Sequence, residues 1–284
     1  MNENSLLKTQ VIKDWLLAAA ARLKNAGIPT PRLDAEIILA HTLRKSRTYL
    51  HAHDDEQLES RNLEIADARI ELRLDRTPVA YIIGHKEFYG RPFKVTPATL
   101  IPRPDSETII TLLDELLPPA FSLIHDIPKR LVDIGTGSGC LGITAKLEHP
   151  ELDITICDIS NHALNVAKSN AKALKAEVTP ILSDLLTDYP FSPDIIIANL
   201  PYVDPEWERS PETNYEPALA LFADNDGLAL IYKLIDEASP RITANGLVFL
   251  EADPRQHAAI STYAKTRGFA VRAKRGFIIV LEKL

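Results

Sequence analysis

Four of the 11 glycines in this chain of 284 residues fall close together, which makes their segment the first candidate for chemistry. They are Gly135, Gly137, Gly139 and Gly142. The cluster follows a short apolar run, residues 131–134, and precedes a helical pattern, which is where an open α/β sheet binds its ligand. One or two glycines would suffice for a tight turn, so four predict a backbone that approaches a ligand closely.

The residues around this loop leave two classes of cofactor to be weighed. From Gly137 to Gly142 the sequence matches the G-x-G-x-x-G pattern of dinucleotide sites, and Asp158 follows at the spacing of their ribose-binding acid. In that pattern the first glycine directly follows the strand, whereas here the strand already ends at Gly135. Asp133 lies just before the loop, and a carboxylate suits an ammonium group and suits a pyrophosphate badly. Register and charge therefore favour a ligand with an amino group.

Counted from the end of the strand, the loop resembles the first motif of class I S-adenosyl-L-methionine-dependent methyltransferases. The segment runs Asp133-Ile134-Gly135-Thr136-Gly137-Ser138-Gly139. The resemblance implies that Asp133 helps to hold the methionine part of S-adenosyl-L-methionine. It also implies that the cofactor lies against Gly135, Thr136, Gly137 and Gly139.

Two further aspartates end later apolar runs. Asp158 ends the run 154–157, where a carboxylate can accept both ribose hydroxyls of either cofactor. Asp184 follows the run 178–182, at the place where such methyltransferases contact adenine. A surface or helix-capping aspartate is an equal alternative for Asp184. We expect both residues to bind the cofactor.

The second candidate site is the tetrapeptide Asn199-Leu200-Pro201-Tyr202, which follows the apolar run 195–198. It resembles the Asn-Pro-Pro-Tyr motif of methyltransferases that modify planar nitrogens, with Leu200 in place of the first proline. Such a nitrogen shares its lone pair by conjugation, so it attacks a methyl group poorly unless the site localises that pair. The Asn199 side-chain oxygen and the Leu200 main-chain carbonyl can accept its two N–H groups, and Tyr202 can stack on it.

We therefore expect the whole tetrapeptide, Pro201 included, to bind the substrate and carry catalysis. Asn199 is also expected beside the cofactor. Asn, Pro and Tyr commonly form turns, so a purely structural turn is the alternative. The placement of the tetrapeptide at a strand's carboxyl end, opposite the glycine loop, favours the catalytic interpretation.

The elements that must position these residues change along the chain. Residues 1–84 show helical spacing of apolar residues and predict an all-helical domain. Residues 85–102 place aromatic and β-branched residues on both sides of a glycine turn, which predicts a β-hairpin linker. Residues 103–284 alternate short apolar runs with helical segments and predict a doubly wound α/β domain. Its last two runs, 269–271 and 277–281, lie too close for a helical crossover and must pair antiparallel.

Composition and charge narrow the classes of function. Hydrophobic residues make up 45% and charged residues 25% of the chain, as in ordinary globular proteins. The 32 Lys and Arg against 39 Asp and Glu give a net charge of −7, which argues against a nucleic-acid partner held by a basic surface. The sequence shows no signal-peptide pattern and no apolar run of membrane-spanning length. The two cysteines and scattered histidines predict no metal site, and we expect a cytoplasmic protein.

The wider sequence is similar to the release factor glutamine methyltransferase family, from about Pro78 to Glu251. The segments that carry the similarity include Glu87-Phe88-Tyr89-Gly90, Leu100-Ile101-Pro102-Arg103-Pro104, Asp158-Ile159-Ser160, Asn170-Ala171 and Tyr215-Glu216-Pro217-Ala218-Leu219-Ala220-Leu221. The helical start fits that family's N-terminal domain in size only. The chain departs from the family at Leu200, at Asp105-Ser106, where Glu-Thr is usual, and at Glu251-Ala252-Asp253, where a glycine is common.

The resemblance implies a Rossmann-like class I methyltransferase domain, with a seven-stranded sheet whose last strand is antiparallel. It implies methyl transfer to the side-chain amide nitrogen (N5) of the glutamine in the Gly-Gly-Gln motif of peptide chain release factors. Residues 1–84 would then recognise the protein substrate. Adenine methylation in DNA or RNA is the first alternative, but it requires a basic surface and a base-flipping channel. A nicotinamide-dependent enzyme and a non-catalytic cofactor sensor are the others.

Overall fold

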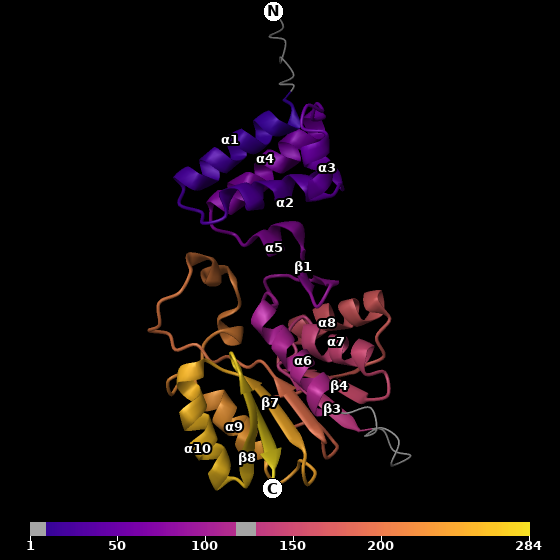
Figure 1. Ribbon diagram of the computed structural model, residues 1–284, viewed down its shortest axis with the longest axis vertical. Coiled ribbons are helices and arrows are strands. Elements are labelled where there is room, and N and C mark those ends of the chain that lie inside the picture. The colour runs from indigo at the N-terminus through magenta and orange to yellow at the C-terminus, as the bar shows by residue number, and fades with distance from the viewer. Residues whose placement is uncertain (1–9, 118–128) are drawn as a thin grey trace, which may run out of the picture. The chain divides into compact units, whose positions relative to one another are not determined.

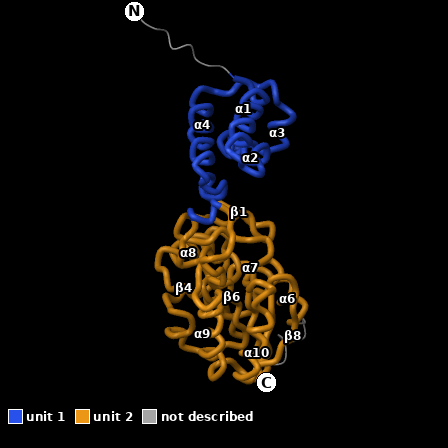
Figure 2. The backbone as a smooth tube through the Cα atoms, turned by 90° about the vertical axis from the view of Figure 1, so that its left-hand side faces the viewer, with its two compact units in different colours: residues 1–84, 211–215 blue, residues 85–210, 216–284 orange. Residues whose placement is uncertain are grey.

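The computed structural model describes residues 10–117 and 129–284, which form two compact units (Figure 2). The helical unit consists of residues 1–84 together with segment 211–215. The α/β unit consists of residues 85–210 and 216–284. The chain therefore enters the helical unit a second time, which nothing in the sequence patterns indicates.

The helical unit is built around one apolar core. Trp15 and Leu16 of its first helix pack there with Ile38 and Leu39 of its second. The third helix is only six residues long, begins after the capping side chain of Ser46, and is too short to show an apolar period. The helices are α1 (Ile12–Asn25), α2 (Pro31–Leu43), α3 (Arg47–Ala52), α4 (Ser60–Leu74) and α5 (Val79–Ile83).

Polar contacts hold segment 211–215 in the helical unit. The buried Arg73 of α4 donates from Nε to Asp34 Oδ2 at 2.7 Å and from Nη2 to Glu212 Oε1 at 3.0 Å. The Tyr215 hydroxyl donates to the main-chain carbonyl at the end of α4. One guanidinium thus serves both a carboxylate of α2 and a carboxylate more than a hundred residues away.

The α/β unit begins with the hairpin. Its strands β1 (His85–Phe88) and β2 (Arg91–Lys94) pair antiparallel. The two turn residues, Tyr89 and Gly90, have φ values of 51° and 71°, as the tight turns favoured in hairpins require. Phe88 and Phe93 are buried and meet edge to face, with ring centroids 6.1 Å apart. The hairpin is therefore packed into the core of this unit.

A seven-stranded sheet forms the centre of the α/β unit, in the order β5-β4-β3-β6-β7-β9-β8. Strands β3 to β7 run parallel, and β9 is antiparallel to both of its neighbours. The expected Rossmann-like sheet with an antiparallel last strand is confirmed. The strands are β3 (Arg130–Ile134), β4 (Asp153–Asp158), β5 (Thr179–Leu182), β6 (Ile195–Ala198), β7 (Leu247–Glu251), β8 (Phe269–Arg275) and β9 (Ile278–Lys283).

Helices cover both faces of the sheet (Figure 1). On β6, Ile195 and Ile197 pack with one set of helices, whereas Ile196 and Ala198 pack with the other. This alternation explains why the strand reads as a continuous apolar run. The first set is α6 (Glu107–Leu116), α7 (Cys140–Glu148) and α8 (Asn161–Leu174), and the second is α9 (Ala229–Ala238) and α10 (His257–Thr266).

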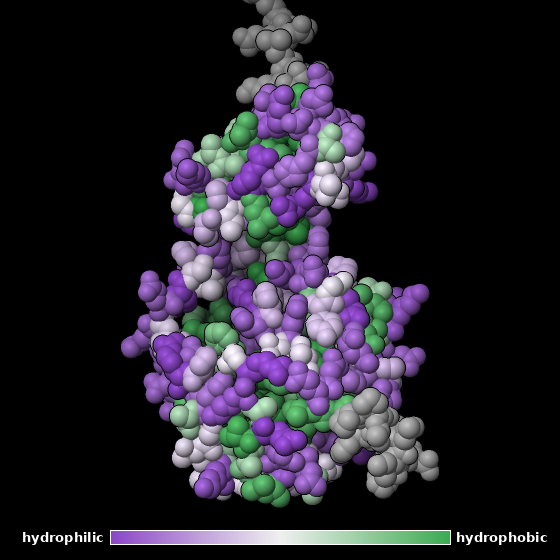
Figure 3. All heavy atoms as spheres, viewed as in Figure 1, coloured by the Kyte–Doolittle hydropathy of each residue, from purple (hydrophilic) through white to green (hydrophobic). Residues whose placement is uncertain are grey.

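Hydrophilic residues predominate on the face drawn in Figure 3, with smaller apolar patches between them. Within residues 10–117 and 129–284, no helix has the length and apolarity needed to cross a bilayer.

The strand order reverses at β3, and this reversal locates the candidate site. The chain proceeds from β3 outward to β4 and β5, and then returns to the other side of β3 as β6. The segments that follow β3 and β6 must therefore diverge from each other, which opens a crevice at the carboxyl ends of the strands. The glycine loop follows β3, and the tetrapeptide 199–202 follows β6.

The pairing of Arg73 generates a stability prediction. Replacing Arg73 with leucine leaves the buried Asp34 carboxylate without its cation, so we expect the free energy of unfolding of the helical unit to fall by about 3–5 kcal/mol. Arg61→Leu, at an exposed position of the same helix, is the matched control and should change little. Urea unfolding followed by circular dichroism measures both, and equal stabilities would contradict the role given to Arg73.

Candidate functional site

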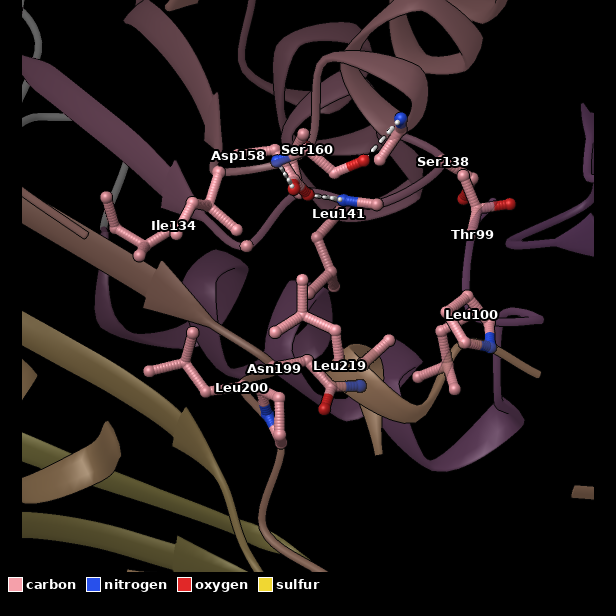
Figure 4. Close-up of a pocket in the computed structure, with 18 of the residues that line it drawn as sticks. Thr99, Leu100, Ile134, Ser138, Leu141, Asp158, Ser160, Asn199, Leu200 and Leu219 are labelled. Carbon is pink, nitrogen blue, oxygen red and sulfur yellow. Dashed lines mark hydrogen bonds between the residues drawn. The ribbon is translucent and has the colours of Figure 1, made fainter. Parts of the chain in front are cut away.

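A cavity opens at the carboxyl ends of β3, β4 and β6 (Figure 4). Three of the expected residues do not line it: Asp133, Gly139 and Tyr202. Among the described residues that do, the only charged side chains belong to Asp158 and Asp184. The cavity is therefore acidic. The expected residues that line it are Gly135, Thr136, Gly137, Asp158, Asp184, Asn199, Leu200 and Pro201.

The glycine loop adopts a backbone that other residues would strain. Gly135, Gly137 and Gly139 have φ values of 70°, 56° and 83°, in the left-handed region. Gly142 is needed for space instead, because a Cβ atom there would lie 2.7 Å from Cγ2 of Ile156. The first three glycines shape the cavity wall and its support, and the fourth lets α7 pack closely on β4.

Asp133 holds this loop from behind the cavity wall. Its Oδ2 accepts a hydrogen bond from Thr136 Oγ1 at 2.5 Å and another from the Gly142 N–H at 2.9 Å. Its Oδ1 is buried without a partner among the described residues. Burial raises the pKa of Asp133 to about 7. The structure thus places Asp133 beneath the loop, where it ties the loop to the start of α7.

The two other aspartates sit in different surroundings. Asp158, at the end of β4, is almost fully buried, and this burial raises its pKa. Its Oδ2 accepts from the Gly137 N–H at 2.9 Å and its Oδ1 from the Ser160 N–H at 2.8 Å, so each oxygen keeps a lone pair for a ligand. Asp184 is half-exposed and forms an ion pair with Lys233 at 2.6 Å. Asp158 is thus fixed by the backbone, and Asp184 by one surface lysine.

The start of the tetrapeptide forms the wall opposite the glycine loop. Asn199 lines the cavity, and its Nδ2 donates to Ser106 Oγ at 3.1 Å. The Leu200 side chain is buried, and a Cβ atom on Gly135 would lie 3.0 Å from its Cδ2. Leu200 therefore packs directly against the glycine loop, so the residue that replaces proline here fills space between the two motifs.

Tyr202 is placed differently from the expectation that it stacks on the substrate. It does not line the cavity, and its ring packs against the apolar cluster between the sheet and helices α9 and α10. Its hydroxyl donates to Glu251 Oε1 at 3.1 Å. Its carbonyl accepts from Gln256 Nε2 at 3.0 Å, and a Cβ atom on Gly227 would lie 1.9 Å from that carbonyl oxygen. Tyr202 is thus held at both ends in this structure.

Sequence reasoning missed several residues that shape the site. Asn170 of α8 donates to the Ser138 carbonyl at 2.8 Å and exchanges two hydrogen bonds with the main chain of Lys94, so it joins the glycine loop to the hairpin. Ser106 and Glu251 meet through a hydrogen bond of 2.5 Å. Asn170 lies in a segment that carries the family resemblance, whereas Ser106 and Glu251 lie where the chain departs from the family. No spacing rule assigned any of the three a role.

Comparisons with known proteins identify the family. Residues 14–84 match the model of the PrmC N-terminal domain, and residues 112–213 match that of the methyltransferase small domain. The release factor glutamine methyltransferase of Koribacter versatilis is 35% identical over 255 residues, which cover 86% of this chain and 88% of that protein. The chain belongs to the release factor glutamine methyltransferase family.

Other relatives extend this result. The bifunctional methyltransferase of Rickettsia bellii is 35% identical over 92% of this chain, which spans about half (51%) of that longer protein. A solved structure of a methyltransferase from Pyrococcus furiosus matches 76% of the chain and 97% of its own, with a TM-score of 0.51 and 16% identity. That structural likeness supports the fold alone, and it agrees with the sheet described above.

The cavity of this family member suits the cofactor expected from its glycine loop. S-adenosyl-L-methionine carries positive charge on its sulfonium and amino groups, whereas a dinucleotide carries a negative pyrophosphate. Asp158 lines the cavity without a paired cation, Asp184 is paired with Lys233, and the described lining includes no cationic side chain. This arrangement fits the first and disfavours the second. The Asp158 carboxylate also has free lone pairs for ribose hydroxyls. The donor set thus fits S-adenosyl-L-methionine.

Replacing Asp158 with alanine tests this fit. We expect S-adenosyl-L-methionine to bind more weakly by about 1–3 kcal/mol, because the ribose hydroxyls lose an acceptor and the loop loses its bond at Gly137. Asp153→Ala, at the exposed start of the same strand, is the matched control. Calorimetry with S-adenosyl-L-methionine, its demethylated product and NAD measures the effect. Equal binding of NAD by the unchanged protein would contradict this cofactor assignment.

Proposed function

We propose that this protein transfers a methyl group from S-adenosyl-L-methionine to the side-chain amide nitrogen (N5) of the glutamine in the Gly-Gly-Gln motif of peptide chain release factors. The observation that carries the proposal is the position of Asn199 and Leu200 on the wall of an acidic cavity, facing the glycine loop. Membership in the release factor glutamine methyltransferase family supports the substrate. Because release factors act in translation, we place the reaction in the cytoplasm.

The chain's own residues bind and orient the cofactor. When bound, S-adenosyl-L-methionine supplies a methyl group on a positively charged sulfur. The glycine loop offers close backbone contact, and Asp158 accepts hydrogen bonds from the ribose. Asp133 acts beneath the loop by holding Thr136 and Gly142, which keeps the left-handed turns in place before any ligand arrives. These residues set the direction in which the methyl group is presented.

The tetrapeptide prepares the nucleophile. An amide nitrogen is a weak nucleophile because its lone pair is delocalised into the carbonyl. The Asn199 side-chain oxygen and the Leu200 carbonyl can accept its two N–H bonds, which holds the nitrogen with its lone pair toward the methyl carbon. Alignment of this kind can contribute up to about 7–11 kcal/mol to the lowering of a barrier. Held in this way, the nitrogen would accept the methyl group as its bond to the cofactor sulfur breaks, and the amide proton would leave to water.

Adenine methylation is not favoured. An enzyme that binds DNA or RNA needs basic side chains along its channel, and base flipping adds the cost of unstacking. The chain has a net charge of −7, and the described residues that line its cavity include no Lys or Arg.

A non-catalytic cofactor sensor is not favoured either. Asn199 and the glycine loop line one cavity, and this arrangement favours catalysis over simple cofactor sensing.

Replacing Asn199 with alanine tests the proposed role of its side chain. We expect kcat on release factor to fall by roughly 100-fold, the size of effect that follows loss of one preorganised hydrogen-bonding group. Cofactor affinity should stay near normal, since Asn199 is assigned to the substrate nitrogen. Asn165→Ala, exposed on α8, is the matched control. If affinity for S-adenosyl-L-methionine falls as far as turnover does, the assignment is wrong.

We further propose that the helical unit recognises the release factor. A single glutamine offers little surface, whereas specific recognition of a folded protein commonly buries about 800 Å² on each partner. The helical unit has its own apolar core, and none of its described residues lines the cavity. A second contact surface on this unit would supply the area that the cavity mouth lacks.

Deletion of residues 1–76 tests this second role. The truncated protein should bind S-adenosyl-L-methionine with near-normal affinity, while kcat/KM on intact release factor falls by more than about tenfold, or 1.4 kcal/mol. A short peptide that contains Gly-Gly-Gln is the control substrate, and both forms should methylate it equally. Unchanged kcat/KM on the intact release factor would show that the helical unit has another task.

A further inference from the structure

Four polar side chains from separate parts of the α/β unit converge beside the cavity. Glu251 ends β7, Ser106 lies just before α6, and Asn199 and Tyr202 follow β6. Glu251 is only 2% exposed, and so is Ser106. No Lys, Arg or His pairs with Glu251 in the part of the chain that the structure describes. A buried carboxylate without a cation is costly, so its surroundings must satisfy it with hydrogen bonds.

Those hydrogen bonds come from neutral groups. The Ser106 hydroxyl donates to Glu251 Oε2 at 2.5 Å, and the Tyr202 hydroxyl donates to Oε1 at 3.1 Å. Burial raises the pKa of Glu251, and the bonds from Ser106 and Tyr202 act against this shift. Both oxygens of Glu251 therefore serve as acceptors, one for each hydroxyl.

The hydrogen bond that Glu251 accepts from Ser106 fixes the direction of the whole chain of bonds. Because the Ser106 hydroxyl donates its single proton to Glu251 Oε2, it has no proton left for Asn199. The Ser106 oxygen can then only accept from Asn199, and only the Nδ2 end of the Asn199 amide can donate. The orientation of the Asn199 amide follows, with Oδ1 left as the free acceptor of a side chain that lines the cavity.

The opposite orientation would obstruct the reaction. A neutral group in place of Glu251 could donate to Ser106, and the Ser106 hydroxyl could then turn its proton toward Asn199. The Asn199 amide would flip to bring Oδ1 onto Ser106, and its N–H groups would face the cavity. A substrate amide nitrogen also presents N–H groups, so two sets of donors would meet.

We propose that Glu251 and Ser106 are positioning residues, which lock the Asn199 side-chain amide with its oxygen toward the substrate nitrogen. The inference rests on the proposed function, because it concerns the same methyl transfer. Neither residue is assigned any contact with the reacting atoms; both act through Asn199. Tyr202 belongs to the same hydrogen-bonded chain, since its hydroxyl donates to the second oxygen of Glu251.

Isosteric variants of the full-length protein test this inference. Glu251→Gln keeps the shape of the side chain but replaces one of its two acceptor oxygens with an NH2 donor. Ser106→Ala removes the link, whereas Ser106→Thr keeps a hydroxyl in place. Glu177→Gln and Ser169→Ala, both at exposed positions, are the matched controls. Calorimetry with S-adenosyl-L-methionine shows whether each variant is folded.

The readouts are kcat and KM on release factor, together with cofactor affinity. We expect Glu251→Gln and Ser106→Ala to lower kcat at least tenfold with unchanged cofactor affinity, and Ser106→Thr to recover most of the loss. The double variant should be no slower than Ser106→Ala, because the pair acts as one unit. A purely structural role predicts weaker cofactor binding and no selective recovery by threonine.

The outcomes separate the two proposals. If the unchanged protein fails to methylate release factor on glutamine, the proposed function falls and this inference with it. If the unchanged protein is active but Glu251→Gln and Ser106→Ala keep normal kcat, only the inference is overturned. It is also overturned if Ser106→Thr is as slow as Ser106→Ala. If Glu251→Gln does not fold, the two serine variants decide.

Discussion

The reversal of strand order at β3 is the constraint on which the site depends. Because β4 and β6 lie on opposite sides of β3, the segments after β3 and β6 part from each other and leave a crevice between them. The glycine loop lies on one side of this crevice and the tetrapeptide lies on the other, although they are some sixty residues apart in the chain. Leu200 packs against Gly135 and sets the distance between the two walls.

Buried carboxylates organise both walls in the same way. Asp133, Asp158 and Glu251 are each nearly inaccessible to solvent, and burial raises the pKa of all three. None is paired with a cation among the described residues. Backbone N–H groups and hydroxyls donate to them instead, and Asp133 Oδ1 is the one oxygen among them that is buried without a partner. Because such bonds are directional, each acid fixes the geometry of the groups that donate to it.

The sequence was informative where the signal was local. The glycine cluster, the apolar runs and Asp158 at a strand end are each short local patterns. They predicted the sheet and, together with the tetrapeptide and Asp184, eight of the residues that line the cavity. The contact between Ser106 and Glu251 spans 145 positions and is created by the fold alone, so no spacing pattern in the sequence could predict it. Tyr202 illustrates the same limit, since its motif suggested stacking on the substrate and gave no indication that its hydroxyl would donate to Glu251.

Segment 211–215 has a consequence for how such proteins can be recombined. It packs with α4 in the helical unit, whereas the residues on either side of it belong to the α/β unit. A chimera cut only after residue 84 would therefore join a foreign helical unit to the original segment 211–215. Arg73 and Glu212 would have to travel together, although one lies in each half of the chain. Each unit is compact, but the two cannot be exchanged by a single cut in the sequence.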